Sequence, residues 1–363
     1  MIELIRDWYK RHFSDPQAAI LALLLLLGFG VVLFAGDILA PLLAAIVIAY
    51  VLDGAIERLE RLRIPRAVAL AIVFTLFIAF LVFLVFGLVP MLLKQTGQLI
   101  REVPGIVERG QALLMQLPER YPRLISEDQV VSFIAAVRRE LLAAGQEVLS
   151  LSLSSVMGLI TFMVYIILVP LMVFFFLKDK RKILDWVAGF LPKERGLSVA
   201  VWREVNAGVA NYIRGKFAEI VIVWVVSFIT FTVLGLNFAM LLSFLVGISV
   251  IIPYVGAAVV TIPVAAVAYY QWGTEPEFVY AVVAYAVIQF LDGNLLVPIL
   301  FSEVVNLHPV AIIAAVLIFG GIWGFWGVFF AIPLATLVKA VITAWPRQRD
   351  GEVPEPAGSP GSS

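Results

Sequence analysis

The chain has 363 residues, of which 62% are apolar and only 14% are charged. A mean hydropathy of +1.02 over the whole chain excludes an ordinary soluble enzyme and is typical of a protein whose surface faces lipid. Lys plus Arg and Asp plus Glu both number 26, so no net basic charge attracts nucleic acid, and we expect no nucleic-acid partner. The absence of Cys excludes disulfides and thiolate metal sites and leaves the redox compartment open.

Long uncharged apolar runs predict membrane-spanning helices, because a helix needs roughly 20 such residues to cross the hydrocarbon core. In chain order, the simple runs are 18–35, 38–52, 67–93, 151–177 and 220–236, of which the second is short. We expect the first run to be retained as a helix, since no cleavage pattern precedes a mature domain. A turn at Gly36 and Asp37 is predicted to separate it from the second run.

Two later runs, 238–270 and 309–338, are too long for straight helices, which rise about 1.5 Å per residue across a core of ~30 Å. Both contain residues that break helices, namely Pro253, Gly256 and Pro263 in the first and Gly320, Gly321, Gly324, Gly327 and Pro333 in the second. We predict that both runs break or fold back. The shared order of glycine and proline fits either an internal repeat or the general frequency of these residues in membrane helices.

The predicted fold class is therefore all-α, a polytopic helical membrane protein with six to eight transmembrane helices, some of them discontinuous or re-entrant. Lys and Arg concentrate in 53–66 and 178–216 and are absent from 271–277 and 292–308. The positive-inside rule then places both termini in the cytoplasm, which requires an even number of crossings.

The segment 94–150 is expected to be a small helical extracytoplasmic module, with equal numbers of basic and acidic residues. Ser126 and Gln129 form a capping-box pattern before an amphipathic helix, whose apolar stripe is Val130, Ile134, Val137 and Leu141. The predicted segments are 1–93 for the N-terminal membrane helices, 94–150 for this module, 151–177 for a membrane helix, 178–216 for a cytoplasmic basic linker and helix, 217–345 for the C-terminal membrane domain and 346–363 for a disordered tail.

No catalytic or energy-coupling motif occurs in the sequence, which lacks a phosphate-binding Gly-Lys-Ser/Thr loop and a His-Glu-x-x-His metal helix. The two histidines are His12 and His308, and His308 lies near other polar residues. We therefore expect no enzyme activity, no cofactor and no metal site.

Polar residues that interrupt apolar sequence are the candidates for a binding site, because a charge at a helix centre costs about 2.5 to 3.5 kcal/mol on insertion scales. The densest group is Gln289, Asp292 and Asn294, with Glu303 and His308 beyond it. An ordinary polar loop at a helix end is the alternative interpretation. Against it, residues 295–301 are apolar again, which favours a bent element inside the membrane.

Two further charged groups have a structural and a functional interpretation. The basic run 178–182 fits a cytoplasmic anchor at anionic headgroups, which is the preferred interpretation. Lys216 and Glu219 are three residues apart, so they face each other on a helix, and a structural ion pair is favoured over a proton relay.

Several motifs in order along the chain resemble those of the AI-2E family of transporters, also called PerM-type permeases. Their matches here are Pro41, Ala49-Tyr50, Asp53, Arg61, Ile64-Pro65-Arg66, Phe175-Phe176-Leu177-Lys178-Asp179, Tyr212, Arg214-Gly215, Ile252-Pro253-Tyr254-Val255-Gly256, Gln289, Asp292-Gly293-Asn294, Pro298, Leu307-His308-Pro309, Gly327 and Pro333. The resemblance covers nearly the whole chain. The sequence departs from the family pattern at Ala257, where Pro is common, at Lys216, where Gln is common, and at Ser302-Glu303, where Gly and a basic residue are common.

The resemblance implies a bacterial inner-membrane permease that forms homo-oligomers, with pentamers expected. Some members of the family export autoinducer-2, a quorum-sensing signal, and others are linked to sodium/proton exchange. The reversed charge at Glu303 weakens any direct transfer of substrate from those members.

Our leading hypothesis is an exporter of a small hydrophilic solute such as autoinducer-2, embedded in the lipid bilayer. Its path is predicted to use the side chains of Gln289, Asp292 and Asn294, the backbone around Pro253 and Gly256, and His308 as an orienting or proton-accepting group. The first alternative is a cation/proton antiporter in which Asp292 or Glu303 exchanges sodium for a proton. The second alternative is a nontransporting oligomeric scaffold that binds a partner through 94–150.

Overall fold

A computed structural model describes residues 16–115, 128, 130–132, 134–136, 139, 156–189, 196–301 and 307–344 of the chain. Every regular element within those residues is a helix. Six helices among them are long and apolar enough to cross a membrane, or seven if the bent pair α7 and α8 counts as one span. The prediction of an all-α polytopic membrane protein with six to eight spans is confirmed.

The described surface carries many large apolar side chains. Phe86 is 77% exposed, Leu317 70% and Val233 81%, and they lie on different helices. An apolar surface of this extent would drive aggregation in water, whereas hydrocarbon solvates it without penalty. The exposed apolar faces are therefore the lipid-facing surface of the helices.

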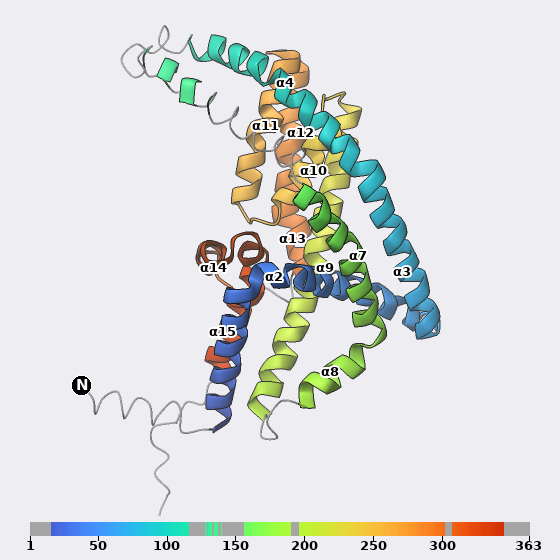
Figure 1. Cartoon of the computed structure of the whole chain (residues 1–363). Coiled ribbons are helices and arrows are strands. Elements are labelled where there is room, and N and C mark those ends of the chain that lie inside the picture. The colour runs from blue at the N-terminus through green and yellow to red at the C-terminus, as the bar shows by residue number, and fades with distance from the viewer. Residues whose placement is uncertain are drawn as a thin grey trace, which may run out of the picture.

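The first described helix, α2, runs from Pro16 to Arg61 over 46 residues. The turn predicted at Gly36 and Asp37 is wrong, because both residues are helical. Glycine and aspartate are poor helix formers, but a helix that already exists on both sides gains one hydrogen bond per residue by continuing. Figure 1 shows α2 bent between its two halves, and Pro41 lies inside the helix, where it removes a backbone N–H and disturbs the preceding turn.

The next helical run consists of α3 (Arg66–Phe83), the π-helical turn η1 (Leu84–Leu88) and α4 (Val89–Leu114). It contains the predicted span 67–93 and continues beyond it without a break. The far part of α4 packs on α11, where Arg109 stacks on the Tyr270 ring at 4.6 Å from the centroid. α4 and α8 lie at opposite ends of the molecule (Figure 1).

The predicted amphipathic helix within 94–150 is only partly described. Val130 and Ile134, the first two residues of its predicted apolar stripe, are buried. Val137 and Leu141 lie outside the described residues, as do both residues of the capping pattern, Ser126 and Gln129.

The helix α7 (Val156–Lys178) packs on α2 and α3, and its buried residues form one apolar core with theirs. The chain then turns through 82° into α8 (Lys180–Gly189). The basic run 178–182 occupies this corner. α8 carries its three basic residues in the first turn and exposes Leu184 and Trp186 beyond it, as suits a helix at a membrane surface.

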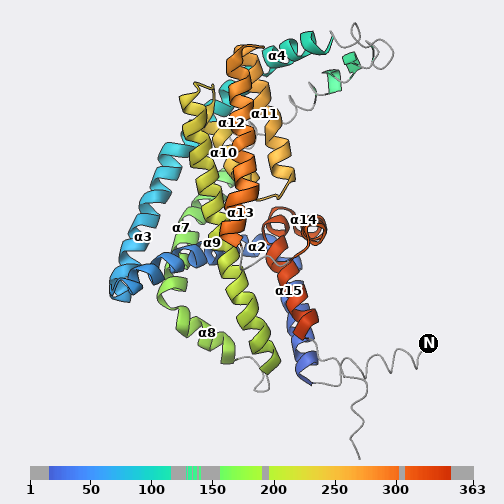
Figure 2. The same ribbon diagram turned by 180° about the vertical axis from the view of Figure 1, so that it is seen from behind.

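The longest element of the C-terminal half is α9 (Gly196–Val233), with 38 residues. It packs against α2 and against four later helices. These are α10 (Ala239–Ser249), α12 (Pro276–Leu291), α13 (Val297–Phe301) and α15 (Ala331–Ala344). Figure 2 shows α9 from the other side, rising from below α2, past it and toward the α10–α13 group. Residues on α9 therefore reach most of the interior.

Both overlong apolar runs are broken, as predicted. The first divides into α10 and α11 (Val255–Trp272), with residues 250–254 between them. The second divides into α14 (Pro309–Phe329) and α15, and α14 is itself kinked at Gly324, which has a φ of 57° and a ψ of −131°.

A glycine permits the close return of the chain at each break. A Cβ on Gly256 would overlap the carbonyl oxygen of Ser249, and a Cβ on Gly327 would overlap the carbonyl oxygen of Phe319. At Gly256 the start of α11 thus packs on the last residue of α10, and at Gly327 the end of α14 packs on the part of α14 that precedes its kink at Gly324. This shared local geometry is the structural counterpart of the sequence similarity between the two runs.

Candidate solute site

One face of α9 carries three polar side chains into the protein interior. Tyr212, Lys216 and Glu219 follow the i, i+4, i+7 spacing of a single helix face. All three are buried, with Lys216 3% and Glu219 2% exposed. Since this part of α9 belongs to a candidate membrane span, these groups require partners within the protein.

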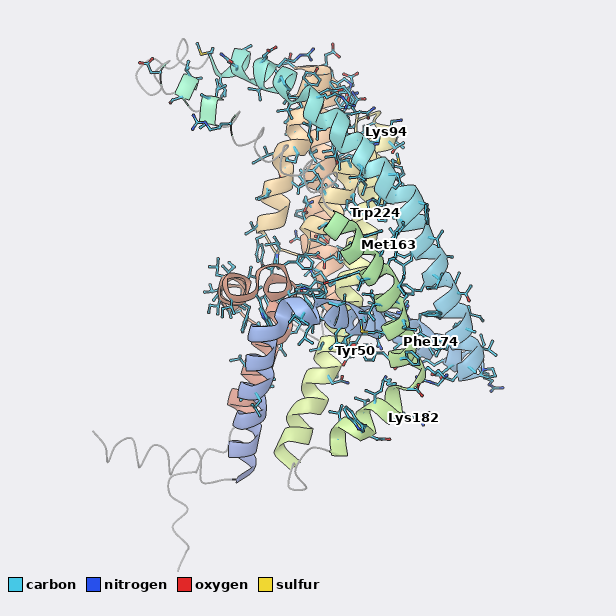
Figure 3. The ribbon with its side chains drawn as sticks, in the orientation of Figure 1. Tyr50, Lys94, Met163, Phe174, Lys182 and Trp224 are labelled. Atoms are coloured by element: carbon cyan, nitrogen blue, oxygen red, sulfur yellow. The ribbon has the colours of Figure 1, made fainter. Side chains whose placement is uncertain are left out.

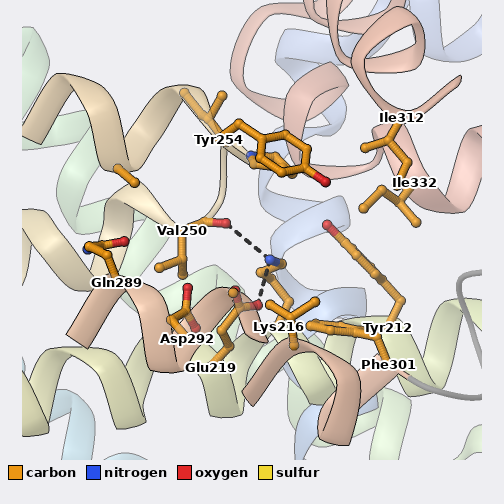
Figure 4. Close-up of a pocket in the computed structure, with 15 residues that line it drawn as sticks. Tyr212, Lys216, Glu219, Val250, Tyr254, Gln289, Asp292, Phe301, Ile312 and Ile332 are labelled. Atoms are coloured by element: carbon orange, nitrogen blue, oxygen red, sulfur yellow. Dashed lines mark hydrogen bonds and ion pairs between the residues drawn. The ribbon is translucent and has the colours of Figure 1, made fainter. Parts of the chain in front are cut away.

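Lys216 makes most of the polar contacts of this group. Its Nζ lies 2.6 Å from Glu219 Oε2 and donates a 3.0 Å hydrogen bond to the carbonyl oxygen of Val250 (Figure 4). The ammonium also lies 5.1 Å from the centre of the Phe301 ring. The ion pair predicted from the spacing of Lys216 and Glu219 is confirmed.

The contact with Val250 connects the ion pair to the helix break. Val250 is the C-cap of α10, so its carbonyl is at the end where the helix dipole is negative. A cation stabilises such an end. Lys216 of α9 therefore holds the end of α10 at the point where the chain leaves it for the segment 250–254.

The second polar side of the site is a π-helical turn. α12 ends at Leu291, η2 (Asp292–Leu296) follows, and α13 continues the same run. Such π-turns occur often at functional sites, because the wider turn changes the direction of the side chains. The chain therefore stays helical from Pro276 to Phe301, so the alternative interpretation, a polar loop that ends a helix, is wrong.

A cavity of about 260 Å³ lies between these elements. Its polar lining consists of Tyr212, Lys216, Glu219, Tyr254, Gln289 and Asp292, and the remaining lining is mostly apolar. Asp292 Oδ1 and Gln289 Nε2 are buried without a hydrogen-bond partner. Figure 4 shows both side chains beside Glu219 and Lys216.

The charges in this cavity do not cancel. Two carboxylates, of Glu219 and Asp292, face one ammonium, of Lys216, which already contacts Glu219. Asp292 therefore has an acceptor oxygen, and Gln289 a donor group, with no partner from the described protein. Groups of this kind are available to a ligand or an ion.

The structure brings together only some of the predicted site residues. Pro253, Gln289 and Asp292 line the cavity, and Gly256 lies at the break just beyond it. Asn294 does not line it, because its side chain is exposed and donates to the carbonyl oxygen of Phe290 at 2.9 Å.

Of the described residues in the predicted site, His308 also does not line the cavity. His308 is the exposed N-cap of α14, where its Nδ1 accepts a hydrogen bond from the N–H of Val310 at 3.2 Å. Glu303 lies outside the described residues.

The sequence-based site missed Tyr212, Tyr254 and the role of Lys216. The helical spacing of Tyr212, Lys216 and Glu219 was the available signal, but it was interpreted only as an ion pair. Tyr254 has a φ of +63°, which is rare for a residue with a Cβ, and it lies over the cavity in Figure 4.

A second charged group lies around Asp53 of α2, and we call it the Asp53 cluster. Asp53 is 4% exposed, and its carboxylate lies 2.7 Å from Lys180 Nζ, 3.6 Å from Arg66 and 3.9 Å from Arg214. Glu60 pairs with Arg66 and Glu57 with Arg214, both at 3.5 Å. The cluster connects α2, α3, α8 and α9.

The Asp53 cluster also explains part of the sequence pattern. Asp53 and Arg66 belong to the opening part of the family pattern, Arg214 belongs to a much later motif, and Lys180 directly follows the central motif. The basic run 178–182 was interpreted as a headgroup anchor, but Lys180 also has this partner inside the protein.

Comparison with known proteins identifies the family. A family model described as AI-2E family transporter matches residues 21–347. A protein of Escherichia coli (strain K12) named as the permease PerM is 48% identical over 353 residues, which cover 97% of this chain and 99% of that protein. YueF of Bacillus subtilis (strain 168), named as a transport protein, is 26% identical over 91% of this chain and 92% of its own.

A further relative carries a more specific name. The AI-2 transport protein TqsA of Escherichia coli (strain K12) is 25% identical over 85% of this chain and 86% of its own length. The family match covers far more than half of the chain, and the 48% identical relative is matched over nearly its whole length. This chain is a multi-pass membrane protein that belongs to the AI-2E family of transporters.

Proposed function

We propose that this permease exports a small hydrophilic solute, such as autoinducer-2, and that the solute binds in the cavity between α9, the α10–α11 break and η2. The observation that carries the proposal is the pair of unpartnered polar groups, Asp292 Oδ1 and Gln289 Nε2, in a cavity within candidate membrane spans. A buried carboxylate oxygen without a hydrogen bond, within a membrane span, raises the free energy of the folded protein, and a binding role accounts for its presence.

The cavity fits this class of solute in size and chemistry. At about 260 Å³ it lies slightly below the usual range of about 300 to 1,000 Å³ for ligand pockets, which favours a compact molecule. A polyhydroxylated solute both donates and accepts hydrogen bonds. Its hydroxyls can donate to Asp292 and accept from Gln289, while the apolar lining contacts its carbon skeleton.

The α10–α11 break supplies a means of access. The segment 250–254 forms one wall of the cavity, and Lys216 fastens its beginning at Val250. Broken helices that meet a polar site are a recurrent feature of transporters, in which one half moves against a neighbour. We infer that movement of this segment opens the cavity.

We further propose a bacterial inner-membrane location with both termini in the cytoplasm, and a homo-oligomeric assembly. The concentration of Lys and Arg in 53–66 and 178–216 supports the orientation. The export direction and the assembly rest on the family resemblance, and autoinducer-2 on the name of the relative TqsA as well.

The test is transport of autoinducer-2 in proteoliposomes by the wild type and by Asp292→Asn. We expect the variant to lower the flux several-fold, because the amide no longer provides the carboxylate acceptor, while expression and oligomer size persist. Glu277→Gln is the matched control, since Glu277 is exposed in the first turn of α12, the helix that leads directly into η2 and Asp292. Equal flux in Asp292→Asn and the wild type would remove Asp292 from the mechanism.

A cation/proton antiporter is the second candidate, and the excess carboxylate favours it. With Glu219 paired to Lys216, Asp292 is free to hold either a proton or a sodium ion. The same vesicles separate the two functions. Sodium added without any organic solute changes the lumenal pH if the protein is an antiporter, and leaves it constant if autoinducer-2 flux is the sole activity.

A further inference from the structure

A second cavity, of about 290 Å³, lies next to the Asp53 cluster. It is lined from four helices by Ile46, Ala49, Tyr50, Asp53, Phe176, Leu177, Lys180, Ile183, Leu184 and Asn206. None of these residues lines the first cavity. Figure 3 shows Tyr50 and Lys182 toward one end of the molecule and Lys94 toward the other, so this cavity lies near the end that carries the basic corner of α7 and α8.

The helix α9 passes both cavities. Asn206 lines the second cavity and Lys216 lines the first. Ten residues of α-helix separate them, which corresponds to a distance of about 15 Å along the axis. The two cavities therefore lie in succession along one helix.

The Asp53 side chain lines the second cavity and has one oxygen without a hydrogen-bond partner among the described residues. The Asp53 side chain is 6% exposed, and its Oδ2 accepts a 2.7 Å hydrogen bond from Lys180. Its other oxygen, Oδ1, is buried without a hydrogen-bond partner, and Arg66 is 3.6 Å away. A hydroxyl group within the cavity would satisfy this oxygen.

The other polar groups supply the complementary donors. Lys180 uses one N–H on Asp53 and retains two others. The Tyr50 hydroxyl donates to Asn206 Oδ1 at 2.5 Å, which leaves the Tyr50 oxygen as an acceptor and the Asn206 amide N–H groups as donors. The polar part of the lining therefore offers both donors and acceptors.

The charges of the cluster favour a neutral ligand. Three cationic groups within 4 Å of the Asp53 carboxylate disfavour a bound cation. The carboxylate itself, together with Glu57 and Glu60 behind it, offsets those groups and disfavours an anion. A neutral molecule with several hydroxyls uses both the donors and the acceptors, and its carbon skeleton fits against Phe176 and Leu184.

We propose that the cavity lined by Tyr50, Asp53, Lys180 and Asn206 is a second binding site for a neutral polyhydroxylated solute. The inference rests on the proposed function, because it assigns the same solute class to a further position along α9. The solute then occupies two sites in succession, one beside the Asp53 cluster and one at the α10–α11 break.

The experiment is equilibrium dialysis of the purified full-length protein with radiolabelled autoinducer-2 and, separately, ribose. The wild type is expected to bind two molecules per chain, and Asn206→Ala one. Tyr50→Phe is a milder second variant, since it removes one hydroxyl and keeps the ring, and it should weaken the same site. Asn237→Ala is the matched control, because Asn237 is exposed in the turn between α9 and α10 and lines neither cavity.

The outcomes separate the two proposals. Two molecules bound per chain in Asn206→Ala, with unchanged affinity in Tyr50→Phe, would overturn the second site and leave the permease proposal intact. If Asp292→Asn still binds two molecules and transports at the wild-type rate, the first site fails, while the loss of one molecule in Asn206→Ala stands. A wild type that binds one molecule of each probe also overturns the second site.

Discussion

The two charged regions of the molecule differ in how their carboxylates are compensated. In the Asp53 cluster, one buried carboxylate has three cationic groups within 4 Å. In the first cavity, two carboxylates face one ammonium, and Asp292 has an unpartnered oxygen. The Asp53 charges are used mainly to connect helices, whereas the Asp292 charge is left available to a ligand. Asp53 thus has the larger structural role, although one of its oxygens also lacks a hydrogen-bond partner among the described residues and its side chain lines the second cavity.

Replacing Asp53 should give the largest loss of folding stability. Asp53→Ala leaves Lys180 without the partner that the structure gives it and removes a shared contact of Arg66 and Arg214. Removing one partner of a buried ion pair costs about 3 to 5 kcal/mol; the three cationic partners are 31 to 43% exposed, which reduces the cost of each contact, but three contacts are lost together, so we expect a loss of stability within that range. The yield and melting temperature in detergent, followed by fluorescence-detected size exclusion, measure this effect.

Two other carboxylates serve as controls for Asp53, and they test whether the Asp53 cluster and the first cavity differ in their contribution to stability. Glu57→Gln removes a carboxylate from the edge of the same cluster, where its side chain is 41% exposed, and should change stability little. Asp292→Leu removes a carboxylate whose Oδ1 is buried without a hydrogen-bond partner among the described residues, and it should keep or raise the melting temperature. If Asp292→Leu lowers the melting temperature as much as Asp53→Ala does, the larger structural role of Asp53 is wrong.

Breaking the Lys216–Glu219 ion pair should give a smaller but still clear loss of folding stability. Lys216→Met leaves the Glu219 carboxylate uncompensated and the Val250 carbonyl without its donor. We expect a loss of about 3 kcal/mol, measured as a lower melting temperature. The loss should be smaller than for Asp53, because one ion pair is broken rather than several contacts.

A double substitution distinguishes the pair from its individual charges. In Lys216→Met with Glu219→Leu, no unpaired charge remains at these positions, so most of the lost stability should return. Additive losses in the double variant would mean that the two side chains act separately. Transport should remain low in either case, since both residues line the cavity.

The sequence was sufficient to predict the spans and the breaks in the two overlong runs. The run 238–270 is too long to cross the bilayer as one straight helix, and Pro253 and Gly256 interrupt it. Together these features predicted a break near the position where α10 ends and α11 begins. Asp292 and Gln289 could be found because polar residues are conspicuous in an apolar run. These signals are local, and no tertiary contact is needed to detect them.

The rest of the site depended on contacts between distant segments. Spacing on α9 indicated that Lys216 pairs with Glu219, but the carbonyl of Val250 comes from another helix and has no signature in sequence. The same holds for Asp53 and Lys180, which are 127 residues apart. The turn predicted at Gly36 and Asp37 failed for the opposite reason, because a weak local signal was overridden by the helix on both sides.

The smallest change in stability and transport is expected when a neutral hydrogen bond beside the first cavity is removed. The buried Tyr285 hydroxyl donates to the carbonyl oxygen of Ala257 at 2.7 Å, and Ala257 lines the first cavity. Thr261 Oγ1 also donates to that carbonyl, at 2.8 Å, so Tyr285→Phe leaves the oxygen with a partner. We expect a loss of about 1 kcal/mol or less and a transport rate within about twofold of the wild type.

Thr261→Val is the reciprocal variant, because it leaves the Tyr285 donor in place while removing the other. Each single variant should be mild, and the double variant should lose more than the sum, since the side-chain donors to the Ala257 carbonyl are then both absent. The melting temperatures of the three variants measure this coupling. A loss in Tyr285→Phe as large as in Lys216→Met would show that the geometry of the α11 start, rather than the charges around Lys216, governs the stability of the cavity.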